Sequence, residues 1–81
     1  MNRFDVFPNP TNNGQVSIAL STTEAVTYDL IVSDLLGRPL YRNNAISTDE
    51  TITVHLNHSG VYFAQLIKDG GAVMTKKIIV Q

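Results

Sequence analysis

Cysteine is absent from the sequence, which excludes disulfide bonds, thiolate catalysis and the usual zinc-binding knuckles. Long apolar runs are missing as well, and those present are far shorter than the ~20 residues that a membrane-spanning helix needs. Six Lys+Arg residues against seven Asp+Glu residues give a net charge of -1, without the basic clusters typical of nucleic-acid binding. We therefore expect no nucleic-acid partner and no direct insertion into a membrane.

Turn-forming residues divide the 81 residues into short segments. They recur about every eight to twelve positions, and the segments between them are rich in Val, Ile, Thr, Tyr and Phe. This pattern predicts an all-β sandwich or barrel of about seven strands. We interpret residues 1–3 as an added start or a linker remnant, and residues 4–81 as a single domain.

Alternating apolar and polar residues give three of these segments one apolar face each, as expected of half-buried antiparallel strands. Residues 60–68 differ, because they are apolar on both faces, which predicts a central strand in the core. The alternating apolar positions are Val16, Ile18 and Leu20, then Val26, Tyr28, Leu30 and Val32, and finally Ile52, Val54 and Leu56.

The last two segments are joined by Lys-Asp-Gly-Gly at positions 68–71, and Asp-Gly supplies the positive φ angles of a tight hairpin turn. We therefore predict one terminal hairpin. Lys76 and Lys77 project to opposite faces of the final strand, so one ammonium lies on the apolar side and reaches water along its stem. This favours a position at the edge of a sheet.

The polar residues form no catalytic or metal-binding pattern. His55 is expected on an outward strand face and His58 in a turn, whereas a zinc site needs three or four convergent ligands. Asp34, Asp49 and Glu50 lack the alternating ligands and central glycine of a calcium loop. Because no nucleophile–base pair or pair of carboxylates is visible either, we expect neither enzyme activity nor a cofactor.

Two motifs are interpreted as structural. At the turn that follows residue 33, Gly37 supplies a backbone conformation that other residues resist, the Asp34 carboxylate caps the turn, and Arg38 is expected to pair with it. Pro8 and Pro10 remove two backbone donors and fix an extended entry into the domain. We interpret the proline segment as a rigid junction at a domain boundary.

Four motifs follow one another along the chain: Val6-Phe7-Pro8-Asn9-Pro10, Asp34-Leu35-Leu36-Gly37-Arg38, Gly60-Val61-Tyr62-Phe63 and Lys76-Lys77-Ile78-Ile79-Val80. Together they resemble the type A carboxyl-terminal sorting domain of the type IX secretion system of Bacteroidetes, over residues 4–81. Each motif is weak alone, whereas their order, their spacing and the chain end after the last motif are specific. Pro39 departs from the pattern, since the family more often has an apolar strand residue there.

The resemblance implies an immunoglobulin-like antiparallel β-sandwich with its C-terminal strand at a sheet edge. It also implies a secretion signal that takes an N-terminally fused passenger protein through the periplasm to the outer membrane surface or the extracellular space. The implied partners are the outer-membrane translocon, its shuttle components, and a sortase-like cysteine peptidase that cleaves the domain off upstream of the Pro-Asn-Pro turn.

An edge hairpin with exposed main-chain groups offers a partner strand pairing and capture of the terminal carboxylate. We therefore hypothesise that the hairpin from Gly60 to Gln81 carries recognition, and we expect Gly37, Gly60 and Tyr62 to be needed for folding. The residues assigned to recognition are Lys76, Lys77, Ile78, Ile79, Val80 and Gln81.

The alternative function comes from another class of protein. An immunoglobulin-like or fibronectin-like adhesive or carbohydrate-binding module has the same strand pattern. Such a module predicts an exposed aromatic platform, for which Tyr28, Tyr41 and Tyr62 are the only tyrosines in the sequence.

Overall fold

The computed structural model describes residues 3–21, 27–47 and 49–81. These residues contain no helix that could cross a membrane. They form seven strands: β1 (Arg3–Phe7), β2 (Gln15–Ser21), β3 (Tyr28–Asp34), β4 (Pro39–Ile46), β5 (Glu50–His55), β6 (Gly60–Lys68) and β7 (Gly71–Val80).

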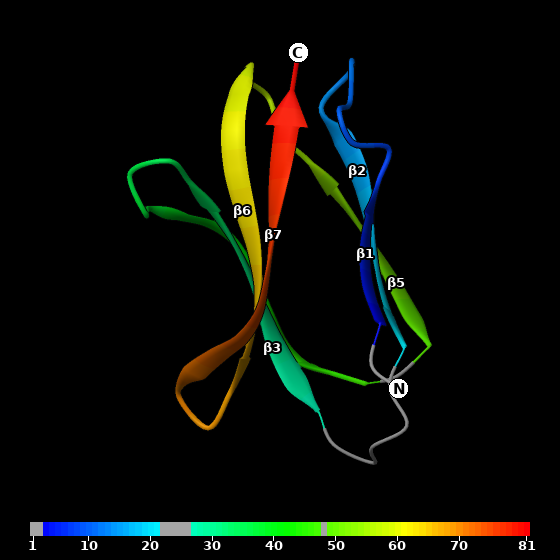
Figure 1. Ribbon diagram of the computed structural model, residues 1–81, viewed down its shortest axis with the longest axis vertical. Helices are drawn as coiled ribbons and strands as arrows, with labels where there is room; N and C mark the ends of the chain where they lie inside the picture. The colour runs from blue at the N-terminus through cyan, green and yellow to red at the C-terminus, as the bar shows by residue number, and fades with distance from the viewer. Residues whose placement is uncertain (1–2, 22–26, 48) are drawn as a thin grey trace.

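The strands form two antiparallel sheets that pack face to face (Figure 1). One sheet has the order β1-β2-β5 and the other the order β4-β3-β6-β7. The arrangement is an immunoglobulin-like β-sandwich, as predicted. Within the four-stranded sheet β6 is central and β7 is at the edge, which confirms the positions expected for the last two strands.

The sandwich has two ends, which are defined by the strand register. At the end that we call the C-terminal end, Asp34 lies opposite Tyr62 and Gly60 lies opposite Val80. At the other end, Arg3 lies opposite Ser21. The first described residue and the end of β7 are therefore at opposite ends of the sandwich, as Figure 1 shows.

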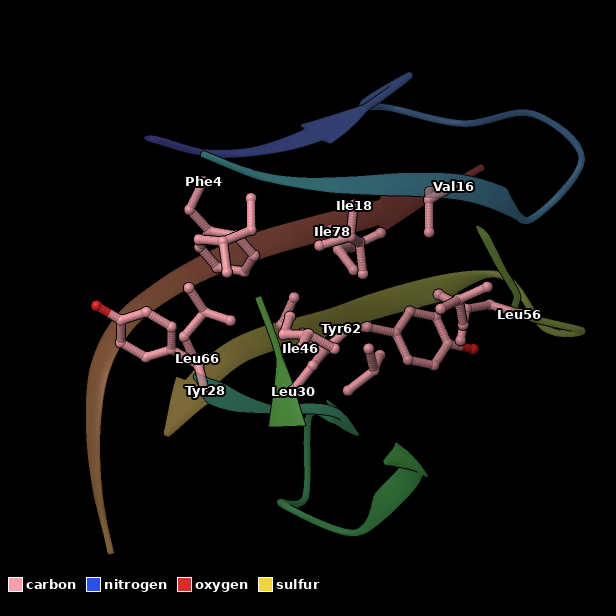
Figure 2. Close-up of a cluster of buried hydrophobic side chains, with 14 of the residues drawn as sticks. Phe4, Val16, Ile18, Tyr28, Leu30, Ile46, Leu56, Tyr62, Leu66 and Ile78 are labelled. Atoms are coloured by element: carbon pink, nitrogen blue, oxygen red, sulfur yellow. The ribbon is translucent and has the colours of Figure 1, made fainter. Parts of the chain in front are cut away.

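The core lies between the two sheets, where apolar side chains from both layers meet (Figure 2). The alternation read from the sequence is confirmed in β2, β3 and β5, although Ile52 is only half-buried and Val26 lies outside the described residues. The buried apolar residues are Phe4, Val16, Ile18, Leu20, Tyr28, Leu30, Val32, Ile46, Val54, Leu56, Tyr62, Ala64, Leu66, Ile78 and Val80.

The hairpin between β6 and β7 has the turn that its sequence predicts. Lys68 pairs with Gly71, and the two residues between them, Asp69 and Gly70, have φ angles of 54° and 80°. Positive φ at both central residues is the conformation whose twist matches the flanking strands.

Strand β1 comes before the Pro-Asn-Pro segment, so the interpretation of that segment as an extended junction at a domain boundary is wrong. Arg3 already pairs with Ser21, one residue earlier than the predicted start of the domain. The peptide bonds preceding Pro8 and Pro10 are both cis. The segment connects two paired strands inside the domain, and its neighbour across the sandwich is the end of β7.

Candidate functional site

The end of β7 has partners along both of its edges. β6 lies on one side, and the side chain of Asn9 lies on the other. The Nδ2 atom of Asn9 donates a hydrogen bond of 2.7 Å to the carbonyl oxygen of Lys77, and its Oδ1 accepts one of 3.0 Å from the N–H of Ile79. One side-chain amide, which carries both a donor and an acceptor, thus occupies two main-chain groups of the strand edge.

Thr11 continues this pairing with its main chain. Its N–H donates to the carbonyl oxygen of Ile79 and its carbonyl oxygen accepts from the N–H of Gln81, both at 2.9 Å. The geometry is that of a parallel bridge between Thr11 and Val80. We call the pair formed by Asn9 and Thr11 the clamp.

The clamp is itself fixed to the connection between β1 and β2. Thr11 is 1% exposed, and its hydroxyl lies 3.1 Å from both Asn13 Oδ1 and the carbonyl oxygen of Gln15. Gly14 follows with a φ of +79°, and a Cβ there would collide with the carbonyl oxygen of Leu56. The N–H of Leu56 donates to the Gly14 carbonyl oxygen at 2.8 Å, which ties the connection to the residues after β5.

The clamp therefore occupies most of the main-chain groups that Lys77–Gln81 would offer for the strand pairing hypothesised from the sequence. The N–H and the carbonyl group of Ile79 that face away from β6 are both bonded to the clamp. The sequence analysis missed this because it treated Asn9 as part of a proline junction and gave Thr11 no role. The usable signal was that Pro8 and Pro10 have no N–H, so the N–H donors available for edge pairing in residues 8–11 belong to Asn9 and Thr11.

The six candidate recognition residues divide between the core and the surface. Ile78 and Val80 are 0% and 6% exposed, and Figure 2 shows Ile78 pointing into the core. Burial of each such side chain stabilises the fold by roughly 1.5–3 kcal/mol. Lys76, Lys77 and Gln81 are exposed and Ile79 is half-buried.

The Asp34 turn has the interactions expected from its sequence. Asp34 Oδ1 accepts hydrogen bonds from the N–H groups of Leu36 and Arg38, each at 2.9 Å, and Arg38 Nε lies 2.7 Å from Asp34 Oδ2. Gly37 has a φ of +83°. The hydrogen bond from the backbone of Arg38, together with the Arg38 guanidinium, holds the pKa of the Asp34 carboxyl below its ordinary value.

Gly60 and Tyr62 close the neighbouring loop at the same end of the sandwich. Gly60 has a φ of +151°, a conformation that residues with a Cβ rarely adopt. The hydroxyl of Tyr62 donates a hydrogen bond of 2.6 Å to the carbonyl oxygen of His58, and its ring is buried in the core. Both residues stabilise the entry into β6.

A shallow groove of about 360 Å³ separates the Asp34 turn from the loop before β6. Leu35, Leu36 and Leu40 line it, and they are 67%, 79% and 53% exposed. Val61 lies on the opposite side of the groove. Because side chains this exposed add little to the core, their apolar character has no explanation in the packing of the sandwich.

Residues suited to metal binding are dispersed over the part of the chain that the structure describes. No group of three His, Asp or Glu side chains there is positioned to hold a metal ion. His55 and His58 are both exposed, as the sequence predicts. Tyr28 and Tyr62 are buried and Tyr41 is half-buried, so these tyrosines do not form the exposed platform that an adhesive module requires.

The fold and the clamped terminal strand define the class of the protein: a small immunoglobulin-like β-sandwich module whose last strand is built into the domain. Comparison with protein families identifies it further, since the model of the secretion system C-terminal sorting domain matches residues 5–81. The chain belongs to this family, whose members are C-terminal secretion signals of the type IX secretion system. The comparison with curated proteins gave no match.

Membership of this family defines the role of the chain in outline. The domain is a secretion signal that acts with the type IX machinery, and the signal implies export to the outer membrane surface or the extracellular space. The family is one of sorting signals and not of catalysts. The match supports the sorting function and not the adhesive alternative.

Proposed function

We propose that the type IX machinery engages the folded sandwich at its terminal segment, Lys76–Gln81. The observation that carries this proposal is the clamp, which bonds the outer edge of the segment at Lys77, Ile79 and Gln81. A terminal strand frays unless it is tied down. The clamp thus gives this segment one fixed geometry that a receptor can read.

Side chains, and not main-chain pairing, present the signal in this proposal. Ile78 and Val80 anchor the segment in the core. Successive side chains of a strand project to opposite faces, so Lys77 and Ile79 lie together on the outer face of the four-stranded sheet. Lys76 projects to the other face and is also exposed.

The geometry suits an order of events that we propose for the passenger. A passenger fused before Arg3 is attached at the end of the sandwich opposite Val80, which leaves the terminal segment accessible. The fusion passes through the periplasm, is received by shuttle components and the outer-membrane translocon, and is then cut upstream of the domain by a sortase-like cysteine peptidase. The passenger is released or displayed at the cell surface.

A secretion assay tests the proposal. A signal peptide and a fluorescent protein are fused before residues 1–81, and supernatants are compared in a Bacteroidetes host with and without a working type IX translocon. We expect release only with the translocon. Equal retention of the folded fusion in both hosts would contradict the proposal.

Deletion of Ile78–Gln81 is a poor test of recognition because it removes two buried core residues. The double variant Lys76→Ser/Lys77→Ser is sharper, since both side chains are exposed. We expect reduced secretion at an unchanged melting temperature. The control is Lys68→Ser, at a half-buried lysine beside the turn at the other end of β6; this variant should be secreted normally.

A further inference from the structure

The two sheets differ in the faces that they turn away from the core. The outer face of the three-stranded sheet carries mainly polar or small side chains, as expected for a solvated sheet; its members include Ser17, Ala19, Thr51, Thr53 and His55. Phe7, which lies opposite Ser17 and is 48% exposed, is the apolar exception. The outer face of the four-stranded sheet carries more branched and aromatic side chains, namely Ile31, Val61, Phe63, Ile67 and Ile79, with the polar residues Ser33, Gln65 and Thr75 between them.

The strand register gathers these apolar side chains into one surface, which we call the outer apolar face. Phe63 lies opposite Ser33 on β3 and Lys77 on β7, and Val61 lies opposite Ile79. All five apolar members are half-buried. The described residues form two sheets only, so none of them makes a further layer that covers this face.

A cation lies on each side of the outer apolar face. Arg42 is opposite Ile31 on the edge strand β4, and Lys77 is on the edge strand β7. Both are exposed, and neither forms an ion pair with a carboxylate of the described residues. The nearby carboxylate, Asp29, accepts a hydrogen bond of 3.0 Å from the N–H of Ala45.

We infer that the outer apolar face is a docking surface for a protein segment of the type IX machinery, one that presents apolar side chains between flanking carboxylates. This inference rests on the proposed function and adds the chemistry of the partner. Apolar contacts in the centre supply the affinity of such interfaces. The charges at the rim fix orientation and increase the association rate.

Charge complementarity favours this occupant over a second copy of the chain. When two copies of this face meet, the cations Arg42 and Lys77 approach the same cations of the other copy, and like charges at an interface are unfavourable. A lipid surface fits less well, because the net charge of -1 gives no long-range attraction to anionic lipids. The face also continues into the groove lined by Leu35 and Leu36, since Val61 belongs to both.

Secretion of the fluorescent fusion tests the inference at two positions outside the terminal segment. Phe63→Thr removes the central apolar side chain, and Arg42→Glu reverses a rim charge. Controls on the other outer face are Ala19→Thr and Arg3→Glu, the second at a cation that, unlike Arg42, pairs with the Asp5 carboxylate. Arg42→Lys keeps the rim charge. Melting curves of the purified domains accompany each assay, so that only variants that stay folded are compared.

We expect secretion of folded Phe63→Thr and Arg42→Glu to fall about tenfold, as for loss of an interface hot spot, while the three controls stay near the wild-type level. If the wild-type fusion depends on the translocon but both folded variants are secreted normally, this inference is overturned and the proposed function stands. If secretion of the wild-type fusion does not depend on the translocon, both the inference and the proposed function are overturned.

Two measurements on the purified domain distinguish the other occupants. In sedimentation, a concentration-dependent dimer that Phe63→Thr abolishes would overturn the assignment in favour of a second copy. Pelleting with phosphatidylglycerol vesicles, lost in Arg42→Glu, would overturn it in favour of a lipid surface. A monomer that does not bind vesicles supports the assignment to a protein partner.

Discussion

The two halves of β7 belong to one strand but are held in different ways. From Gly71 to Lys76, β6 is the one strand of the described residues that pairs with β7, and Val73 is 51% exposed. From Lys77 onward the clamp bonds the outer edge and two side chains are buried. The half nearer the end of the strand is thus the better fixed one, which reverses the usual fraying of terminal segments.

The comparison shows that only part of the outer edge of β7 is open to pairing with other chains. An unpaired strand edge is a template for pairing with other chains. The clamp closes this edge beside Lys77–Gln81, and the charged side chains Lys76 and Lys77 protect the transition between the halves. In the function that we propose, recognition of the terminal segment therefore depends on its side chains.

The largest difference between the halves should appear on truncation of side chains. Ile78→Ala removes a fully buried side chain and should lower the free energy of unfolding by about 2–5 kcal/mol. Val73→Ala, in the open half, should change it by less than about 0.5 kcal/mol. Urea unfolding followed by circular dichroism measures both, and equal effects would refute the contrast.

Proline substitutions in the two halves should also differ in their cost to stability, by less than the side-chain truncations do. Ladder geometry alternates along the strand, so the N–H of Thr75, like that of Ile79, faces away from β6. Ile79→Pro removes a donor bonded to Asn9 and should cost about 3 kcal/mol, whereas Thr75→Pro lies on an open edge, where proline is tolerated. If the two variants have the same melting temperature, the hydrogen bond from Ile79 to Asn9 contributes nothing to stability.

Removal of the Asn9 side chain from the clamp should have the next largest effect on the free energy of unfolding. Asn9→Ala leaves the N–H of Ile79 and the carbonyl oxygen of Lys77 without their partner and should cost about 1–3 kcal/mol. Asn12→Ala, at an exposed position of the same connection, should change stability by less than about 0.5 kcal/mol. The free energies of unfolding of both variants decide whether the clamp stabilises the fold.

The smallest expected effect on stability comes from the Asp34 turn, which does not contact the clamp and therefore serves as a control region. The pKa of the Asp34 carboxyl is held below its ordinary value of 3.8 in the folded protein. The ionised carboxylate therefore contributes fully to stability above that pH, and this contribution is lost as the pH falls through the lower pKa of the folded state. Asp34→Asn should remove this part of the acid sensitivity below about pH 4 without affecting the amide of Ile79. A pH series of melting curves shows the first effect, and hydrogen exchange shows the second.

Much of the fold was predictable because it follows from local chemistry. Alternation in β2, β3 and β5 fixed their buried faces, Asp-Gly predicted the terminal hairpin, and the roles of Asp34 and Arg38 followed from the turn between them. Each of these inferences uses residues close together in sequence, where spacing alone brings the groups together.

The clamp was not predictable in the same way. Asn9 and its partner Ile79 are 70 positions apart, and periodicity contains no information about which distant edge a short connection will meet. The proline pattern was visible, but it was assigned to an extended junction because the preceding strand, Arg3–Phe7, is short. The outer apolar face was missed for a related reason: the apolar pattern of residues 60–68 does not show whether another layer covers it.

Native-state hydrogen exchange of the backbone amides tests the clamped terminal segment most directly. The amides of Ile79 and Gln81, bonded to the clamp, should exchange at least about a hundredfold more slowly than those of Thr75 and Lys77, whose N–H groups face the same edge without a clamp bond. Asn9→Ala should remove the protection of Ile79. Equal exchange at all four amides in the wild-type protein would contradict the account.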